Sequence, residues 1–447
     1  MSRATISTGI IDWKRDETET KDCGDSGYLL LLGDFSAAGS RAAVPTPRLQ
    51  RVDRDTLDEV FAKLDVRLKL PFSDEPLHFT EMDDLHPDFL YEQVELFAEM
   101  RDLQRRLENP KTFATTAAEL TSGEEPVKPS LDELLATAPD PSAAPTLDIP
   151  KLIYDIVAPH IVPAPTPQQT ALQASVQEAT AELMRKLLHQ SGFRALEACW
   201  RGLDLLLRRL DGDREPRLFL VDCPAAHLPQ LLATGGALEG LLQSAGLLDS
   251  APTLIVADYR YGGTATDLAS AAALAEFAQR RDCVALGGGD ERLAGCRGLS
   301  ADPDDWNTFD ATVKEAWDAL RSTPAAQYLA LIAPRFLLRA PYGKRTATTD
   351  LGFEEWVTGD SRTLPWGNGV WLAALARCND DDSVAALPLP PSTGIDESRA
   401  LSSAETLLSD RAASRLKAAG LMPLRAERDS DRVYFAEWTS CYLESRD

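Results

Sequence analysis

A proline-rich run in the first half of the chain limits what this protein can fold into. Ten of its 29 prolines lie between residues 113 and 170, where the only aromatic residues are Phe113 and Tyr154. Such a segment buries too little apolar surface to offset the entropy lost on ordering, and its prolines favour extended backbone. We therefore expect a small module at residues 1–112, a flexible tether at 113–170 and a larger module at 171–447, as if two proteins had been joined.

Composition and charge narrow the class of protein. A length of 447 residues suits two or three domains, and 44% hydrophobic with 26% charged residues is typical of a globular chain. The formal net charge of −24 argues against nucleic acid and against insertion into or docking on anionic membranes, because those partners need basic patches. We interpret the acidity as a solubility feature, with a specific basic partner as the alternative.

Cysteine usage and the N-terminus indicate the compartment. The seven cysteines are scattered singly and form no CxxC pair, which is typical of a reducing environment. The first residues contain no apolar core followed by a cleavage site, and no stretch approaches the roughly 18 apolar residues of a membrane span. These features predict a cytosolic protein.

The first module has the pattern of a small α+β unit. An apolar run at 28–32 predicts a buried strand that enters a turn, and the spacing at 57–64 predicts a helix. Short strands are expected at 67–70 and 77–80. The strongest element is a helix over 87–107, which begins at a proline and ends before an Asn-Pro pair.

The larger module has the pattern of an α/β sheet covered by helices. Apolar runs typical of strands buried on both faces alternate there with amphipathic helical stripes. Strands are expected at 218–221, 254–257, 328–333 and 433–438, and helices at 172–187, 193–207, 264–280, 304–321 and 410–419.

Catalytic motifs are few and incomplete. The string GDSG at 24–27 matches the serine motif of trypsin-like proteases, but no histidine precedes it and no all-β pattern surrounds it. A glycine run at 287–289, followed by Asp290, could bind an anion through backbone N–H groups. The full phosphate-loop spacing is missing there and at Gly343-Lys344, so we favour a plain turn.

Titratable residues also fail to form a catalytic constellation. The five histidines never stand four residues apart, so neither a zinc site nor any other cofactor is predicted. Asp83 and Asp84 could pair as acid and base, but before a helix they are more simply turn and capping residues. Arg335 and Arg339 could clamp a phosphate, yet salt-bridged arginines at a strand edge or a subunit contact are the favoured interpretation. The residues therefore predict a scaffold or assembly protein and no enzyme.

Several strings in the larger module, taken in order, resemble the large subunit of the contractile sheath of type VI secretion systems. They are FRALEACWRGLDLLL at 193–207, ADYRYG at 257–262, PRFLLRAPYG at 334–343, FEE at 353–355, LPWGNGVWLAALA at 364–376 and GLMPL at 420–424. The motif residues implied by this resemblance are Glu197, Trp200, Arg201, Gly202, Asp258, Tyr259, Trp317, Arg321, Pro334, Arg335, Arg339, Pro341, Tyr342, Gly343, Trp366, Gly367 and Asn368.

The first module resembles the small subunit of the same sheath. Gly33, Asp34 and Phe35 match that family's glycine–aspartate–phenylalanine turn, and Pro87 opens a helix like that of the family. His86 and the residue before it stand where the family usually has aspartate and phenylalanine.

The two resemblances imply a structural function without catalysis. In that family the two subunits form a heterodimer, copies stack in helical rows around an inner tube, and contraction drives the tube outward. The chain would then be a fused sheath protomer in the bacterial cytoplasm, with energy held in two packings of the same subunits. The implied partners are copies of itself or other sheath subunits, the inner tube protein, the baseplate and the recycling AAA+ ATPase.

Two departures from the family leave an alternative open. The chain stops at Asp447, whereas the family's large subunit continues into a C-terminal region, and the tether replaces the free N-terminus that the ATPase engages in some systems. The alternative is a non-polymerising sheath-like accessory, capping or baseplate adaptor protein. Both sheath interpretations predict that the two modules pack together, and a nucleotide-binding enzyme built on the glycine run is the weakest alternative.

Overall fold

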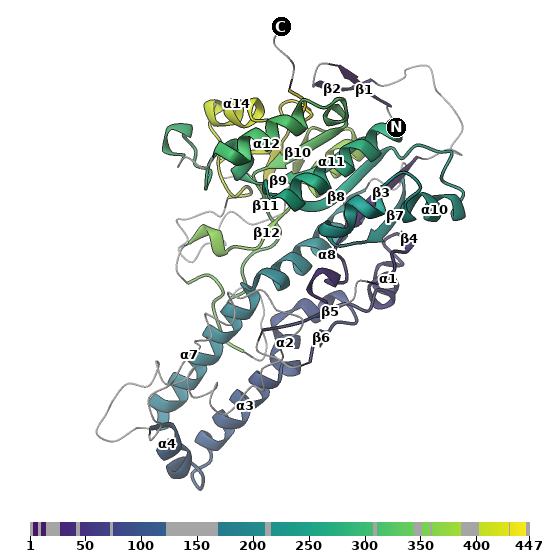
Figure 1. The fold of residues 1–447 in the computed structure, drawn as a ribbon. Coiled ribbons are helices and arrows are strands. Elements are labelled where there is room, and N and C mark those ends of the chain that lie inside the picture. The colour runs from purple at the N-terminus through teal and green to yellow at the C-terminus, as the bar shows by residue number, and fades with distance from the viewer. Residues whose placement is uncertain are drawn as a thin grey trace.

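The chain folds into a body with a long helical arm (Figure 1). The computed structural model describes residues 3–7, 10–14, 27–41, 45–71, 75–121, 169–210, 216–306, 311–343, 351–357, 360–385, 402–428 and 430–443. A mixed sheet with helices on both faces forms the body, which confirms the predicted α/β class.

Seven strands of the described residues form the central sheet, in the order β14-β10-β9-β8-β3-β7-β4. All neighbours are parallel except β4 and β7, which are antiparallel. The bounds are Met422–Pro423 for β14, Leu329–Ala333 for β10, Val284–Gly289 for β9, Leu254–Tyr261 for β8, Tyr28–Gly33 for β3, Arg217–Asp222 for β7 and Leu49–Val52 for β4.

Strand β3, from the start of the chain, lies inside this sheet. Leu29 is opposite Leu218 of β7 on one side and opposite Leu254 of β8 on the other. All six residues of β3 are buried, as expected for an apolar run covered on both faces. The two predicted modules therefore pack together, as expected, and they do so by sharing one sheet.

Alternate residues of β3 face two separate cores. Leu29 and Leu31 pack with α8 (Ser191–Arg209) and α13 (Val370–Asn379) on one face of the sheet. Leu30 and Leu32 belong to the core on the other face, which four helices and a helical turn cover. These elements are α9 (Leu228–Leu231), α10 (Ala237–Ser244), α11 (Ala265–Arg280), α12 (Ala311–Arg321) and α14 (Asp410–Ala418).

The helix predicted over 87–107 is two helices. They are α2 (Pro87–Gln93) and α3 (Glu95–Glu108), and Val94 between them has extended backbone angles, φ −78° and ψ 122°. Val94 ends α2 and begins α3, and its β-branched side chain is buried. The single-helix prediction was wrong because periodicity continues across a one-residue break that keeps both apolar faces inward.

The arm consists of α3, α7 (Gln169–Leu188) and α4 (Phe113–Thr121) (Figure 1). Gln169 donates from Nε2 to the carbonyl of Leu107 at 2.7 Å, which ties α7 to the end of α3. Helix α4 lies within the predicted tether, so the tether's first residues are not extended, because they bury Ala117 and Leu120. The amphipathic patches predicted at 131–135 and 152–157 lie outside the described residues.

Shorter elements complete the fold. Helix α1 (Leu57–Lys63) confirms the predicted helix, and the short strands predicted after it appear as a pair. The remaining strands are β1 (Arg3–Ser7), β2 (Ile10–Lys14), β5 (Arg67–Leu68), β6 (Leu77–His78), β11 (Phe336–Leu337), β12 (Trp366–Gly367), β13 (Ser383–Ala385), β15 (Arg425–Ala426) and β16 (Arg432–Tyr434).

Several predicted elements need correction. The closing strand predicted at 433–438 is the shorter β16, which lies between β13 and β15 in a small separate sheet. The helix predicted at 304–321 begins as α12 at Ala311, and a short 3-10 turn precedes it at Pro303–Asp305. Among the described residues, no helix is long and apolar enough to cross a membrane.

The glycine run 287–289 is the end of strand β9 and forms no turn. A Cβ atom on Gly287 would lie 2.7 Å from Leu331, and one on Gly288 would lie 2.7 Å from Asn368. These glycines let side chains from neighbouring elements lie against the sheet. The predicted turn was wrong, because the glycines here permit close packing of neighbouring side chains. The interpretation that the run does not bind an anion rests on the missing phosphate-loop spacing and does not depend on the turn.

Candidate functional site

The motif residues gather around helix α8. Gln190 caps its start, because the side-chain Oε1 accepts from the N–H of Phe193 at 2.6 Å. One side of α8 packs on the sheet, and the other side meets the PRFLLRAPYG segment at 334–343 and the N-terminal segment. We call this region the joint, defined by Glu197, Arg201, Arg339, Tyr342 and Glu355.

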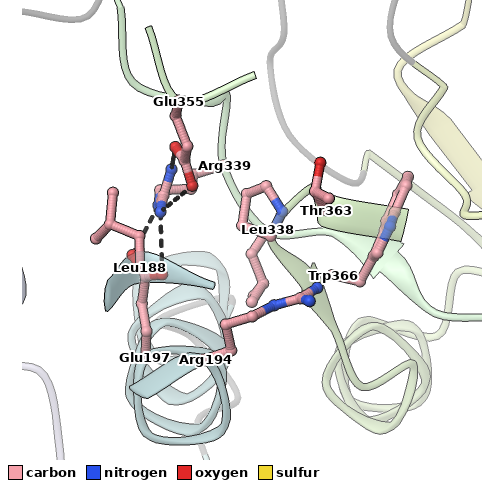
Figure 2. Close-up of a pocket in the computed structure, with 9 residues that line it drawn as sticks. Leu188, Arg194, Glu197, Leu338, Arg339, Glu355, Thr363 and Trp366 are labelled. Atoms are coloured by element: carbon pink, nitrogen blue, oxygen red, sulfur yellow. Dashed lines mark hydrogen bonds and ion pairs between the residues drawn. The ribbon is translucent and has the colours of Figure 1, made fainter. Parts of the chain in front are cut away.

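An arginine with 11% of its side chain exposed links two buried glutamates at the centre of the joint (Figure 2). Arg339 donates from Nε to Glu197 Oε1 at 2.7 Å and from Nη1 to Glu355 Oε2 at 2.7 Å. Both glutamates are nearly inaccessible, with residue exposures of 2% and 3%. Paired, charge-assisted bonds of this kind compensate for the desolvation of each charge. The prediction that Arg339 is salt-bridged is confirmed.

Arg201 and Tyr342 extend this network. Arg201 donates to Glu197 Oε1 at 2.8 Å and to the Tyr342 hydroxyl at 2.9 Å. The Arg339 guanidinium lies 4.0 Å from the centroid of the Tyr342 ring, a cation–π contact. Burial would raise the pKa of Glu197, but the charges of Arg339 and Arg201 outweigh it and hold that pKa at about 2. Glu197 is therefore ionised at any physiological pH.

The N-terminal segment reaches the joint through His86. Its ring lies edge-on to Tyr342, with centroids 5.0 Å apart and planes at 83°. His86 also caps helix α2, since its Nδ1 accepts from the N–H of Asp88 at 3.2 Å. Burial lowers the pKa of His86, which keeps the ring neutral and able to accept that bond. A residue that departs from the small-subunit pattern thus forms a contact between the two modules.

Trp200 forms the second contact between the modules. Its Nε1 donates to the carbonyl of Phe35 at 2.7 Å, and its ring lies 5.4 Å from Phe35 and 4.3 Å from Phe61. Asp34 holds the preceding turn, because its carboxylate accepts from the N–H groups of Ala38 and Gly39. The glycine–aspartate–phenylalanine motif therefore positions the Phe35 carbonyl that accepts the hydrogen bond from Trp200.

Three carboxyls lie toward the carboxyl ends of neighbouring parallel strands. Asp34 follows β3, Asp222 ends β7 and Asp258 lies in the second half of β8. Burial, and then the charge of Asp222, raise the pKa of Asp34 to about 6, and burial raises the pKa of Asp258 to about 6. Burial also raises the pKa of Asp222. Among the described residues, no group of three or more His, Cys, Asp or Glu is arranged to hold a metal ion.

The raised pKa values predict that the protein loses stability as pH rises. A carboxyl whose folded pKa is about 6 stays protonated over a pH range in which the same carboxyl of the unfolded chain, with its pKa near 4, ionises. Its contribution to stability is therefore lost as pH rises from about 4 to about 6, and it changes little above that range. We expect the urea midpoint to fall between about pH 4 and pH 6, and Asp258→Asn to remove part of that slope. The exposed Asp249→Asn is the control, and an equal slope in all three proteins would contradict the prediction.

Gly202 permits the close approach of α8 and α13. A Cβ atom there would lie 2.2 Å from Cδ1 and Nε1 of the fully buried Trp371. We expect Gly202→Ala to lower the free energy of unfolding by about 2–3 kcal/mol, through overpacking. Gly240→Ala in α10 is the matched control, since nothing lies within 4 Å of its Cβ position, and it should be neutral or gain up to about 1 kcal/mol. Urea unfolding of both variants tests the difference, and similar stabilities would refute it.

Three motif residues, Arg335, Trp317 and Arg321, form contacts away from the joint. Arg335 forms a bidentate ion pair with Glu405 at 2.6 and 2.9 Å, as the salt-bridge interpretation predicted. In α12, Trp317 donates a hydrogen bond to the carbonyl of Ala419, and Arg321 donates one to the carbonyl of Cys441. These contacts fasten the end of the chain to the body.

The other motif residues contact the backbone near the carboxyl ends of β7 and β8 or permit close packing elsewhere. Asn368 donates to the carbonyl of Tyr259, and the Tyr259 hydroxyl donates to the carbonyl of Cys223. A Cβ on Gly367 would lie 2.5 Å from Leu338, and one on Gly343 would lie 2.2 Å from Glu354. Pro334 forms a cis peptide bond with Ala333. Asp84 caps a short helical turn through Thr80 and Glu81, as the capping interpretation predicted.

Sequence reasoning missed the most important partner in the joint. Glu355 was noted only as part of the FEE string, and no role was assigned to it. A guanidinium has one charge and five N–H donors, which carboxylates, carbonyls or hydroxyls can all accept, so the sequence carried no signal for a second acidic partner. The GDSG residues at 24–26 and Lys344 lie outside the described residues.

The joint leaves no room for a substrate. Arg194, Glu197, Arg339, Glu355 and Trp366 line a cavity of about 10 Å³, which holds no more than one water molecule (Figure 2). Each charge of the network is already neutralised by a neighbour. The arrangement can hold structural elements together, and it offers no space for chemistry on a bound molecule.

The chain is similar to a known protein family and to a known protein. Residues 248–381 match the VipB family, described as EvpB/VC_A0108, tail sheath N-terminal domain. The type VI secretion system sheath protein TssC1 of Pseudomonas aeruginosa is 24% identical over an alignment of 291 residues, which covers 56% of this chain. The chain thus spans 56% of the length of that relative. Both similarities are to sheath proteins.

Proposed function

We propose that the chain is a structural protein of a type VI secretion contractile sheath, in which small-subunit and large-subunit modules are fused into one protomer. The observation that carries this proposal is the position of β3. The matched region, 248–381, contains β8 and β9, and the strand next to β8 comes from the motif that resembles the small subunit. Strands from both proposed modules thus belong to a single sheet.

The contacts around α8 support a protomer that moves as one body. The Trp200–Phe35 hydrogen bond and the contact of His86 with Tyr342 of the joint both cross between the two predicted modules. Residues 1–112 and 171–447 are then parts of one unit, with 113–170 as the connection between them. We propose that the energy for contraction resides in contacts between such units, where two packings differ in free energy.

The proposed partners follow from this function. They are further copies of the chain or other sheath subunits, the inner tube protein, the baseplate and the recycling AAA+ ATPase, all met in the bacterial cytoplasm. No catalytic step and no cofactor is part of the proposal. A second candidate is a non-polymerising accessory, capping or baseplate adaptor protein, because the similarity covers only 56% of the relative's length.

Electron microscopy of the purified full-length chain tests the proposal. A fused protomer should form tubules or helical rods by negative stain, alone or with the inner tube protein. Monomers at high concentration under both conditions would contradict it. A fluorescent fusion should label the whole length of a sheath in cells, whereas a single focus at one end would favour the adaptor.

A further inference from the structure

Both long helices of the arm are interrupted where the arm meets the body (Figure 1). Val94 alone separates α3 from α2, and His189 and Gln190 separate α7 from α8. Val94 has φ −78° and ψ 122°, and Gln190 has φ −61° and ψ 133°, so the backbone of both is extended. We call these two interruptions the breaks.

No helical ladder runs through the breaks. Among the described residues, no backbone hydrogen bond joins α2 to α3, and none joins α7 to α8. The ladders begin again at the breaks themselves, since the N–H of Ala98 donates to the carbonyl of Val94 and that of Arg194 to the carbonyl of Gln190. A continuous helix resists bending through its i→i−4 bonds, whereas a few residues at element ends can absorb the backbone rotation of a hinge.

The arm holds together without help from the body. Gln169 at the start of α7 is hydrogen-bonded to the carbonyl of Leu107 at the end of α3. An ion pair between Arg106 and Glu119 joins α3 to α4. Leu107 and Leu172 are buried in the same apolar core, so α3 and α7 also share a packed interface. The three helices therefore form one piece that keeps its own shape.

The helices on the body side of the breaks are held independently of the arm. Gln190 caps α8 with its own side chain, so the start of α8 needs no bond from α7. Arg194 in the first turn of α8 donates to the carbonyl of Leu364 at 2.7 Å. At the other break, α2 is held at its start by the contact of His86 with Tyr342. Both helices keep these partners whichever way the arm points.

Arg101 is the main polar link across the first break. From α3, its guanidinium donates to the carbonyls of Tyr91 and Glu92, the second at 3.1 Å, and it lies 4.9 Å from the centroid of the Tyr91 ring. These carbonyls are in the last turn of α2, which lacks helical partners for them. Across the second break, Arg185 of α7 donates to the carbonyl of Glu354 at 3.3 Å, a longer bond.

We propose that the arm pivots on the body as one piece about Val94 and Gln190, and that Arg101 is the latch that limits this motion. Apolar packing at the base of the arm is non-directional, so the helices there can slide by small amounts. Arm and body each contain residues of both predicted modules, so the pivot leaves the sheet and the joint intact. The inference goes beyond the proposed function and does not depend on it.

The length of the arm makes a small rotation measurable. The 20 residues of α7 extend over about 30 Å, so a rotation of about 15° displaces the far end of the arm by about 8 Å. The turn between α3 and α4, which contains Lys111, lies at that end (Figure 1).

Distances between spin labels in the full-length chain test the pivot. Nitroxides on unnatural amino acids at the exposed positions 111 in the arm and 78 in the body give the arm–body distance by pulsed electron paramagnetic resonance. The pair 111 and 177 lies within the arm, and the pair 78 and 244 lies within the body. We expect the arm–body distance distribution to be about twice as wide as either control.

Two variants test the latch. Arg101→Ala should widen the arm–body distribution further and leave both control distributions unchanged. Arg105→Ala is the matched control, because Arg105 is exposed on the same helix and its ion pair with Asp102 lies within α3. It should leave all three distributions as they are in the wild type.

Three results would overturn parts of the proposal. An arm–body distribution as narrow as the controls in the wild type refutes the pivot, and this measurement needs no substitution of Arg101. A wide arm–body distribution that Arg101→Ala and Arg105→Ala affect equally refutes the latch. A wide distribution within the arm refutes its movement as one piece. Electron micrographs without rods would refute the sheath protomer and leave these results unaffected.

Discussion

Residues 169–447, expressed without the preceding segment, are expected not to fold. Their sheet would lose β3 (Tyr28–Gly33) from between β7 and β8. Each of the four leucines in β3 has 0% exposure, and burial of four such side chains contributes about 6–12 kcal/mol. Because a domain's net stability is about 5–15 kcal/mol, this loss is comparable to the whole. Residues 1–121 alone should likewise remain unfolded, since β3 would have no partner strand.

Co-expression of the two segments tests whether the defect lies in the missing strand. We expect 1–121 and 169–447, produced in one cell, to copurify and to unfold in one cooperative transition. Deletion of residues 1–14 is the control, because among the described residues the backbone pairing of that hairpin with the rest of the chain is limited to a hydrogen bond to Trp438 and a bridge to Thr439. That deletion should leave a folded protein. A cooperative transition from 169–447 alone would refute the prediction.

Substitution of Arg339 by Leu is expected to lower the free energy of unfolding by about 3–5 kcal/mol. The change leaves Glu197 and Glu355 buried and without their shared counter-charge. Urea denaturation measures the loss. Arg362→Leu is the matched control, because its ion pair with Asp360 is exposed to solvent, and its loss should leave the urea midpoint nearly unchanged.

A combined variant separates charge from packing in the joint. Arg339→Leu together with Glu197→Gln and Glu355→Gln removes the unpaired charges, so it should recover part of the lost stability. No recovery would mean that Arg339 acts through its packing against Tyr342. A loss below about 1 kcal/mol for Arg339→Leu itself would contradict the assigned role of the joint.

Local patterns predicted most of the elements. The apolar run at 28–32 became β3, the stripe at 193–207 lies within α8, and the helix expected at 410–419 is α14, which Gly420 follows with φ +82°. The errors have local causes too. Val94 interrupts one helix without interrupting its periodicity.

The joint was only half predictable. Arg335 and Arg339 were expected to be salt-bridged, and both are. Their acidic partners come from distant parts of the chain, since Glu197 is 142 residues away from Arg339. Spacing along a sequence carries no information about pairs of this kind. The resemblance to sheath subunits singled out Glu197 but not its function.

The sequence by itself determined where most strands and helices form, and it contains, in order, motifs that resemble those of sheath subunits. Periodicity, proline and glycine act within a few residues, so they can be read without a partner. Only the tertiary structure decided that β3 enters the sheet between β7 and β8, and that Arg339 lies between two glutamates. Those outcomes depend on which buried surfaces and charges best satisfy one another across the whole chain, and no local segment contains that information.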